Sequence, residues 1–265
     1  MTKDMVRLLE RADIELIDVA DAKAAWRQYR LLNGYVTERP ILSNDTDNMK
    51  FAKSAKAGIR TMGLALAPHK TSVDYNVCRY ATICAEACVA HAGHGRWDKT
   101  KDARSLKTHF LAENPNAFLT LIVDEIDRAV ERHGEVAVRL NTFSDIPWET
   151  VAPFLFERWG SKVDFYDYTK WPVSVRPSHP SYDLTRSASE KSTDEEIVGM
   201  LEAGERVAIC IDWPKKGDAP ATHLGYPVVD GDVHDARFTE PKGVVVLLRP
   251  KGTARKSGFA RKPTP

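Results

Sequence analysis

The sequence predicts an α/β protein built around a largely parallel sheet. Six apolar segments of strand-like composition alternate with amphipathic helical segments. Polar side chains follow nearly every predicted strand, and 265 residues can bury the core of one large α/β domain or two small ones. Alternating strands and helices imply parallel strands with right-handed crossovers. Such a series could form a doubly wound sheet or a partial barrel.

Residues 1–50 predict a polar N-terminal extension that is partly helical. An amphipathic helix is expected over 21–32, and Asn33-Gly34 ends it because glycine readily takes the left-handed backbone at a helix end. The central region, 51–250, carries the predicted sheet. Its six strands are expected at 58–67, 135–140, 163–168, 182–185, 207–211 and 244–248.

Helices are expected between these strands. Asn114-Pro115 separates two of them, because asparagine caps a helix and proline is tolerated in its first turn. A capping box at 192–195 opens the last one. The predicted helices cover 101–113, 114–133, 151–159 and a segment from the capping box to 203.

Bulk composition excludes several classes of protein. The net charge is +1, so there is no overall attraction to nucleic acids or membranes. No apolar stretch is long enough to span a bilayer, and the N-terminus lacks a signal-peptide core, which predicts a cytoplasmic protein. Residues 251–265 predict a basic, disordered tail that either contacts nucleic acid through its phosphates or only aids solubility.

Polar residues after the strands predict a ligand site, because the carboxyl ends of parallel strands meet at one edge of a sheet. Ordinary turns and caps use the same residue types, which is the alternative for each residue taken alone. Asp167 and Lys170 could serve acid–base chemistry or form a structural ion pair. The expected cofactor contacts are Asn141, Ser144, Asp145, Thr185 and Ser187, with Arg104 and Lys107 on one helix face as anion contacts or a solvated surface.

Three cysteines, Cys78, Cys84 and Cys88, lie within eleven residues directly after the first predicted strand. In a cytosolic protein such a group indicates a metal site rather than disulfides. Three thiolates can hold an iron–sulfur cluster and leave one coordination position open. Zinc with His91 or His94 as a fourth ligand, and no metal at all, are the alternatives. The fourth cysteine, Cys210, stands in an apolar run and is read as core.

A three-cysteine loop after the first strand of a six-unit β/α series resembles the radical S-adenosylmethionine superfamily. The resemblance implies a six-unit partial (β/α) barrel in which Cys78, Cys84 and Cys88 bind a [4Fe-4S] cluster whose fourth iron takes S-adenosylmethionine. It also implies radical chemistry on a polar substrate, for which a nucleoside or a nucleic-acid base is one candidate. The spacing here, Cys-x5-Cys-x3-Cys, is wider than the usual Cys-x3-Cys-x2-Cys of that superfamily.

A second resemblance covers most of residues 50–252 and is to a family of bacteriophage-encoded proteins without assigned function. It implies that the protein works in the cytoplasm of a host cell. It leaves open a zinc-stabilised module that binds nucleic acid or a host protein without catalysis. The strings that carry it include those at 76–81, 139–141, 144–149, 165–170 and 230–232.

Overall fold

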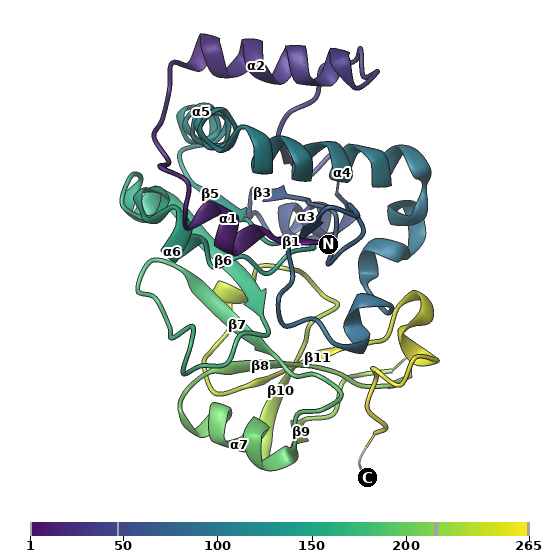
Figure 1. Ribbon diagram of the computed structural model, residues 1–265. Helices are drawn as coiled ribbons and strands as arrows, with labels where there is room; N and C mark the ends of the chain where they lie inside the picture. The colour runs from purple at the N-terminus through teal and green to yellow at the C-terminus, as the bar shows by residue number, and fades with distance from the viewer. Residues whose placement is uncertain (1, 47, 215–216, 264–265) are drawn as a thin grey trace.

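All six predicted strands are present in the computed structural model, which describes residues 2–46, 48–214 and 217–263. They pair side by side, all parallel and in chain order (Figure 1). Short runs rich in β-branched apolar residues favour buried strands, as at 207–209 and 245–248. The strands are β3 (Thr61–Leu64), β5 (Val136–Arg139), β6 (Val163–Thr169), β7 (Asp183–Ser187), β8 (Arg206–Cys210) and β11 (Val245–Leu248).

Three strands that the sequence did not reveal complete a nine-stranded sheet. β2 (Leu42–Ser43) pairs antiparallel with β3, while β10 (Tyr226–Asp230) runs parallel to β11 and antiparallel to β9 (Thr222–His223). The order is β2-β3-β5-β6-β7-β8-β11-β10-β9, so β2 and β9 are the two edges. Among the described residues the sheet is therefore open and mixed, and no closed barrel is formed. A separate two-stranded pair joins β1 (Lys3–Asp4) to β4 (Tyr75–Asn76).

The long helices lie close to their predicted positions. The capping box is formed by Thr193 and Glu196, one residue later than expected. The helix predicted at 151–159 is instead a short α6 (Trp148–Val151) and a 3₁₀ turn from Pro153, because proline lacks the N–H that a continuing helix needs. The others are α2 (Val19–Leu32), α4 (Asp98–Glu113), α5 (Pro115–His133) and α7 (Asp194–Glu202), with α1 (Met5–Leu9) and α3 (Met49–Lys56) unpredicted.

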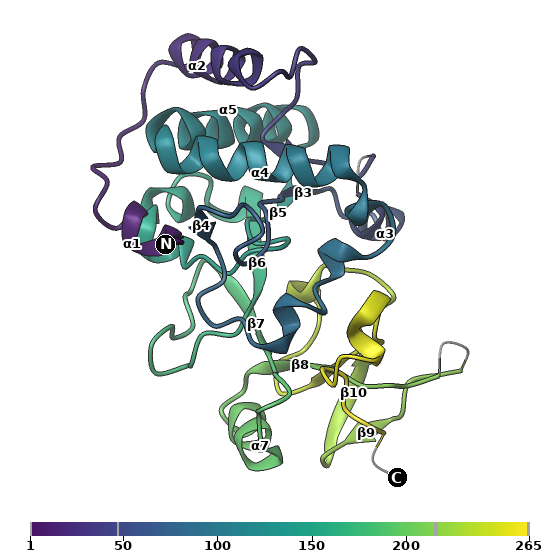
Figure 2. The ribbon, with the colours of Figure 1, turned by 45° about the vertical axis from the view of Figure 1, so that its right-hand side comes forward.

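Alternation of side chains along the strands separates a helix-covered face from a face that borders a cavity. On β8, Ile209 packs with α7, whereas Ala208 and Cys210 line the cavity. On β5, Val138 lies in the core with α4 and α5, whereas Arg139 lines the cavity. Figure 2 shows α4 and α5 over β3 and β5, with α7 beside β8. A doubly wound sheet would carry helices on both faces.

The N-terminal extension is part of the main core rather than an appendage. Met5 and Leu9 of α1 are buried, and so is Trp26 of α2, whose ring lies 4.8 Å from that of Phe110 on α4. Burying each such side chain stabilises the fold by about 1.5–3 kcal/mol. Among the described residues, no helix has the length and apolarity needed to cross a membrane.

The C-terminal segment, expected to be disordered from residue 251, packs against the rest of the protein as far as it is described. Arg261 exchanges backbone hydrogen bonds with Cys210 (2.9 Å) and Asp212 (2.8 Å), and the Thr253 hydroxyl donates to the Glu86 carbonyl (3.2 Å). Figures 1 and 2 show this yellow segment beside the blue cysteine loop. Residues 264–265 of the predicted tail lie outside the described residues.

Ion pairs explain why this basic segment is held. Three of its cations, together with the neighbouring Arg249, lie against acidic side chains at or after the ends of β8 and β10 and at the start of α7, so they do not repel one another as a free tail would. This leaves fewer charges for nucleic-acid phosphates than the sequence indicates. The pairs are Arg249–Asp230 (2.8 Å), Lys251–Asp232 (2.8 Å), Arg255–Asp212 (2.9 Å) and Arg261–Asp194 (2.6 Å).

Candidate functional site

A cavity of about 1200 Å³ opens at the carboxyl ends of the parallel strands. Ligands of parallel sheets bind at this edge. All but two of the residues expected from the sequence line it. They are Cys78, Cys84, Cys88, Arg104, Lys107, Asn141, Ser144, Asp145, Lys170 and Ser187. The exceptions, Asp167 and Thr185, are fully buried and lie outside its lining.

The cysteines belong to an irregular loop between β4 and α4 that contains three short 3₁₀ turns. None of the three is in a disulfide. The Cys78 backbone N–H donates to the side chain of Asn76 (3.0 Å), and its thiol donates to the Phe143 carbonyl (3.5 Å). Burial raises the pKa of the Cys78 thiol, and the neighbouring Cys88 and Cys84 act in the same direction. Cys84 and Cys88 therefore both lie within electrostatic reach of Cys78.

The three cysteines do not form a site for a single metal ion in the part of the chain that the structure describes. Among the described residues, no group of three His, Cys, Asp or Glu side chains is placed to hold one metal ion. A single ion draws all its ligands together, whereas an iron–sulfur cluster binds each thiolate to a different iron and so separates them. His94 lines the cavity and stacks on Trp97 at 4.1 Å, while His91 does not line it.

A buried cation lies beside the cysteines. Arg104 is 4% exposed, and its Nη2 donates to the Gly95 carbonyl (2.8 Å). Its Nε and Nη1 have no partner among the described residues. Burial lowers the pKa of Arg104, and Cys88 opposes that change. A buried guanidinium without a counter-charge is costly, so an anionic cluster held at Cys88 would satisfy it.

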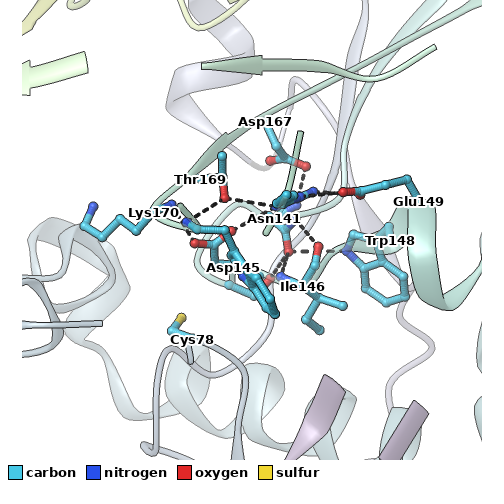
Figure 3. Close-up of polar contacts among 12 residues, drawn as sticks. Cys78, Asn141, Asp145, Ile146, Trp148, Glu149, Asp167, Thr169 and Lys170 are labelled. Carbon is cyan, nitrogen blue, oxygen red and sulfur yellow. Dashed lines mark hydrogen bonds and ion pairs between the residues drawn. The ribbon is translucent and has the colours of Figure 1, made fainter. Parts of the chain in front are cut away.

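Asn141 follows β5 and organises the turn that faces Cys78 (Figure 3). Its side-chain oxygen accepts from the Ser144 hydroxyl (2.8 Å) and the Ile146 N–H (2.9 Å). Its amide nitrogen donates to the Ile146 carbonyl (2.9 Å) and the Tyr182 hydroxyl (3.2 Å). Asn141 lines the cavity, but its polar groups are used within the protein. Its role is to shape the wall rather than to bind a ligand directly.

Asp145 fixes the position of Lys170 at the end of β6. One carboxylate oxygen accepts the Lys170 backbone N–H (2.8 Å), and the other pairs with Arg176 (3.0 Å). Burial raises the pKa of Asp145, and Arg176 opposes the change. The Lys170 side chain extends away from Asn141 (Figure 3), and its ammonium lies 5.5 Å from the ring of Phe259.

Asp167 and Lys170 do not form the acid–base pair suggested by their proximity in sequence. The Asp167 carboxylate accepts the Tyr182 hydroxyl (2.6 Å) and the Asn141 N–H (2.9 Å) and pairs with Arg139 (3.3 Å). Asp167 has no exposed surface, and it holds Arg139 and Asn141, which line the cavity. Of the two residues, Lys170 alone lines the cavity.

Asp167 makes the stability of the protein depend on pH. Burial raises the pKa of Asp167 to about 7, against the influence of Arg139 and Tyr182. In the unfolded chain an aspartate titrates near 3.9, so between about pH 4 and 7 the folded state holds the extra proton. Stability from this group is therefore present at low pH and is lost as the pH rises through that window. We expect the free energy of unfolding of the wild type, measured relative to Asp167→Asn by urea denaturation, to decrease from pH 5 to pH 8. A constant difference between the two proteins would contradict this assignment.

Sequence reasoning missed several residues that line the cavity. Cys210, read as core, faces the cavity because it alternates with the buried Ile209 on β8, and strand periodicity was the available signal. Trp97 and Lys53 had no such signal, since they stand outside the strand ends. Phe259 lines the cavity from the segment that was expected to be disordered.

Comparison with models of protein families identifies a match over most of the chain. The model of a family described as Gene product 88 matches residues 40–263 of the chain. None of the curated proteins and none of the solved structures matches it. The match spans the sheet, the cysteine loop and the C-terminal segment, and it includes all of the cavity lining except Thr37, Glu38 and Arg39.

Proposed function

The chain belongs to the Gene product 88 family, which is of phage type, and from this premise we propose that it is an iron–sulfur enzyme of the radical S-adenosylmethionine kind. In this proposal Cys78, Cys84 and Cys88 hold a [4Fe-4S] cluster, and the adjoining cavity holds S-adenosylmethionine and a polar substrate. One observation carries the proposal. Three cysteines from a single loop line one cavity at the carboxyl ends of six parallel strands that follow one another in chain order.

The sheet supports this proposal through the order of its strands and the position of its helices. Parallel strands in sequential order, with helices packed on one face, are what a partial β/α barrel needs. When bound, the cluster would supply one electron for reductive cleavage of the cofactor. Each cysteine would bind one iron, which leaves the fourth iron open to a ligand.

The chain's own residues prepare this part of the cavity. Arg104 brings a positive charge beside Cys88, which favours negative charge there. The Phe143 carbonyl and the Asn76 side chain hold Cys78 against the turn after β5. The C-terminal segment contacts the cysteine loop at Glu86 and adds Phe259 to the wall of the cavity.

Anaerobic purification followed by reconstitution tests the proposal. We expect a brown protein with about four irons and four sulfides per chain. After reduction, it should cleave S-adenosylmethionine to 5′-deoxyadenosine. A colourless protein with stoichiometric zinc would overturn the iron–sulfur assignment and favour a zinc-stabilised binding module. A protein that carries the cluster without cleaving S-adenosylmethionine would overturn the radical chemistry alone.

A further inference from the structure

We propose that the substrate of this cavity is a nucleotide, with its phosphate at Lys53 and Lys170 and its base on the ring of Trp97. The inference rests on the proposed function only in taking this cavity as the active site. Its evidence comes from the charges and rings of the wall, and it does not require the cysteines to hold a metal.

The acidic side chains of the wall are largely neutralised by the protein itself. Four carboxylates line the cavity, and three of them form ion pairs with arginine or lysine. The fourth, Glu38, is exposed to solvent. The pairs are Asp145–Arg176 (3.0 Å), Asp232–Lys251 (2.8 Å) and Asp235–Arg139 (2.6 Å).

Two lysines of the wall keep their charge available. The Lys53 ammonium donates to the Asp232 backbone carbonyl, and Lys170 lies over the ring of Phe259. Both partners are neutral, so neither lysine is compensated by its contact. Both contacts lie near the end of β8. Asp232 follows β10, which is two strands from β8 in the sheet, and Phe259 is two residues from Arg261, whose backbone N–H donates to the Cys210 carbonyl (2.9 Å).

Two ammonium groups that line one cavity favour an anion with several charged oxygens. Lysine binds phosphate as a point charge, and a phosphate group can accept from two lysines at once. Arg104, near Cys88, is a third cation of the wall held by backbone carbonyls. The cavity as a whole therefore presents a positive potential, which favours a phosphate-bearing ligand over a neutral one.

Trp97 provides an aromatic surface in the same cavity. Its side chain is 55% exposed although it lines the cavity, which is unusual for the largest apolar side chain. His94 stacks on one side of the ring, with an interplanar angle of 23°, and so fixes its orientation. A base stacks on such a ring regardless of its sequence identity, because every base has a flat π face.

The size of the cavity suits a nucleotide beside a second ligand. Sites for a single drug-sized molecule measure about 300–1000 Å³, and this cavity reaches about 1200 Å³. A phosphate and a planar base are the two parts of a nucleotide that these walls would recognise. A lone carboxylate or a neutral sugar would leave either Trp97 or the lysines without a partner.

Equilibrium dialysis with the full chain, both as purified anaerobically and after cluster reconstitution, tests the inference. The probes are the four common ribonucleoside 5′-monophosphates, their nucleosides and inorganic phosphate. We expect the monophosphates to bind at least about tenfold more tightly than either the nucleosides or phosphate, with affinity falling as salt rises. The combined change Lys53→Met and Lys170→Met should weaken nucleotide binding about tenfold or more and leave nucleoside binding unchanged.

Matched variants test the contribution of the two lysines and that of Trp97 separately. Lys191→Met removes an exposed lysine outside the cavity lining and should leave binding unchanged. Trp97→Leu should weaken both nucleosides and nucleotides, and Trp97→Phe should restore most of the loss. Equal binding of nucleosides and monophosphates, or a double variant that behaves like Lys191→Met, would overturn the inference. Binding of inorganic phosphate as tight as that of nucleotides would overturn the role of Trp97.

The cysteines make failure of this inference distinguishable from failure of the proposed function. The variant with Cys78, Cys84 and Cys88 all replaced by alanine cannot hold the cluster, yet it should still bind nucleotides. A wild-type protein that binds nucleotides but takes up no iron would keep this inference and overturn the iron–sulfur proposal. An iron-loaded wild type that binds none of the nucleotides would overturn this inference and keep the iron–sulfur proposal.

Discussion

Alanine at Cys78, Cys84 or Cys88 is expected to remove the iron–sulfur chromophore, whereas alanine at Cys210 leaves it in place. Three thiolates are the smallest set that holds a [4Fe-4S] cluster while keeping one iron open, so the loss of one should release it. Iron and sulfide should fall from about four per chain to near zero. Cys210 is the matched control, because it lines the same cavity from β8, outside the cysteine loop.

Iron and sulfide analysis with visible absorption measures this effect, and circular dichroism checks that each variant is folded. The cysteines of the loop are only partly buried, so removing one sulfur should change the free energy of unfolding of the metal-free protein by about 1 kcal/mol. Equal iron in the Cys84→Ala and Cys210→Ala proteins would show that the loop is not the ligand set. Loss of iron in all four variants would point to Cys210 as a further ligand.

Replacing Arg176 by methionine is expected to destabilise the folded protein by about 3–5 kcal/mol. Arg176 is 2% exposed and pairs with Glu149 (2.6 Å) and Asp145 (3.0 Å). Removing the guanidinium leaves two largely buried carboxylates without their counter-charge. The methionine fills similar space, so the effect reports the unpaired charge rather than a cavity.

Urea denaturation of the wild type and of Arg176→Met at pH 7 measures this loss of stability. Arg158→Met is the control, because Arg158 pairs with Asp127 at 2.7 Å with both side chains over 40% exposed. An exposed pair of this kind contributes about 0–1 kcal/mol. Similar losses of unfolding free energy in both variants would show that the buried ion pairs around Asp145 contribute no more to stability than an exposed pair does. Since Asp145 also holds the Lys170 backbone, Arg176→Met should weaken nucleotide binding as well.

Much of the sheet was accessible from the sequence because strand signals are local. A short apolar run bounded by turn residues identifies a buried strand without any knowledge of its neighbours. All six strands predicted this way are found, in parallel and in order. The short strands β2, β9 and β10 were missed. β2 and β9 have only two residues each, too few for a periodic pattern.

The helix ends were less accessible, since caps depend on backbone geometry. Asn114 precedes α5 as predicted, but its side chain makes no capping hydrogen bond, and its carbonyl accepts the Phe118 N–H instead. The C-terminal segment was misread because its composition is basic and rich in proline and glycine. Its order comes from acidic partners such as Asp194, which lies 67 residues away from Arg261.

Taken by itself, the sequence determined the parallel strands, their order and a trio of cysteines at the edge where ligands bind, since each depends on residues close together in the chain. Only the tertiary structure decided which polar groups face the cavity. Asn141 and Asp167 look available in the sequence, but contacts with Tyr182 and Arg139 use them inside the protein. Arg139 in turn meets Asp235 across 96 residues of chain. Such pairings form only when distant segments pack together, and burial then makes each unpaired charge too costly to leave.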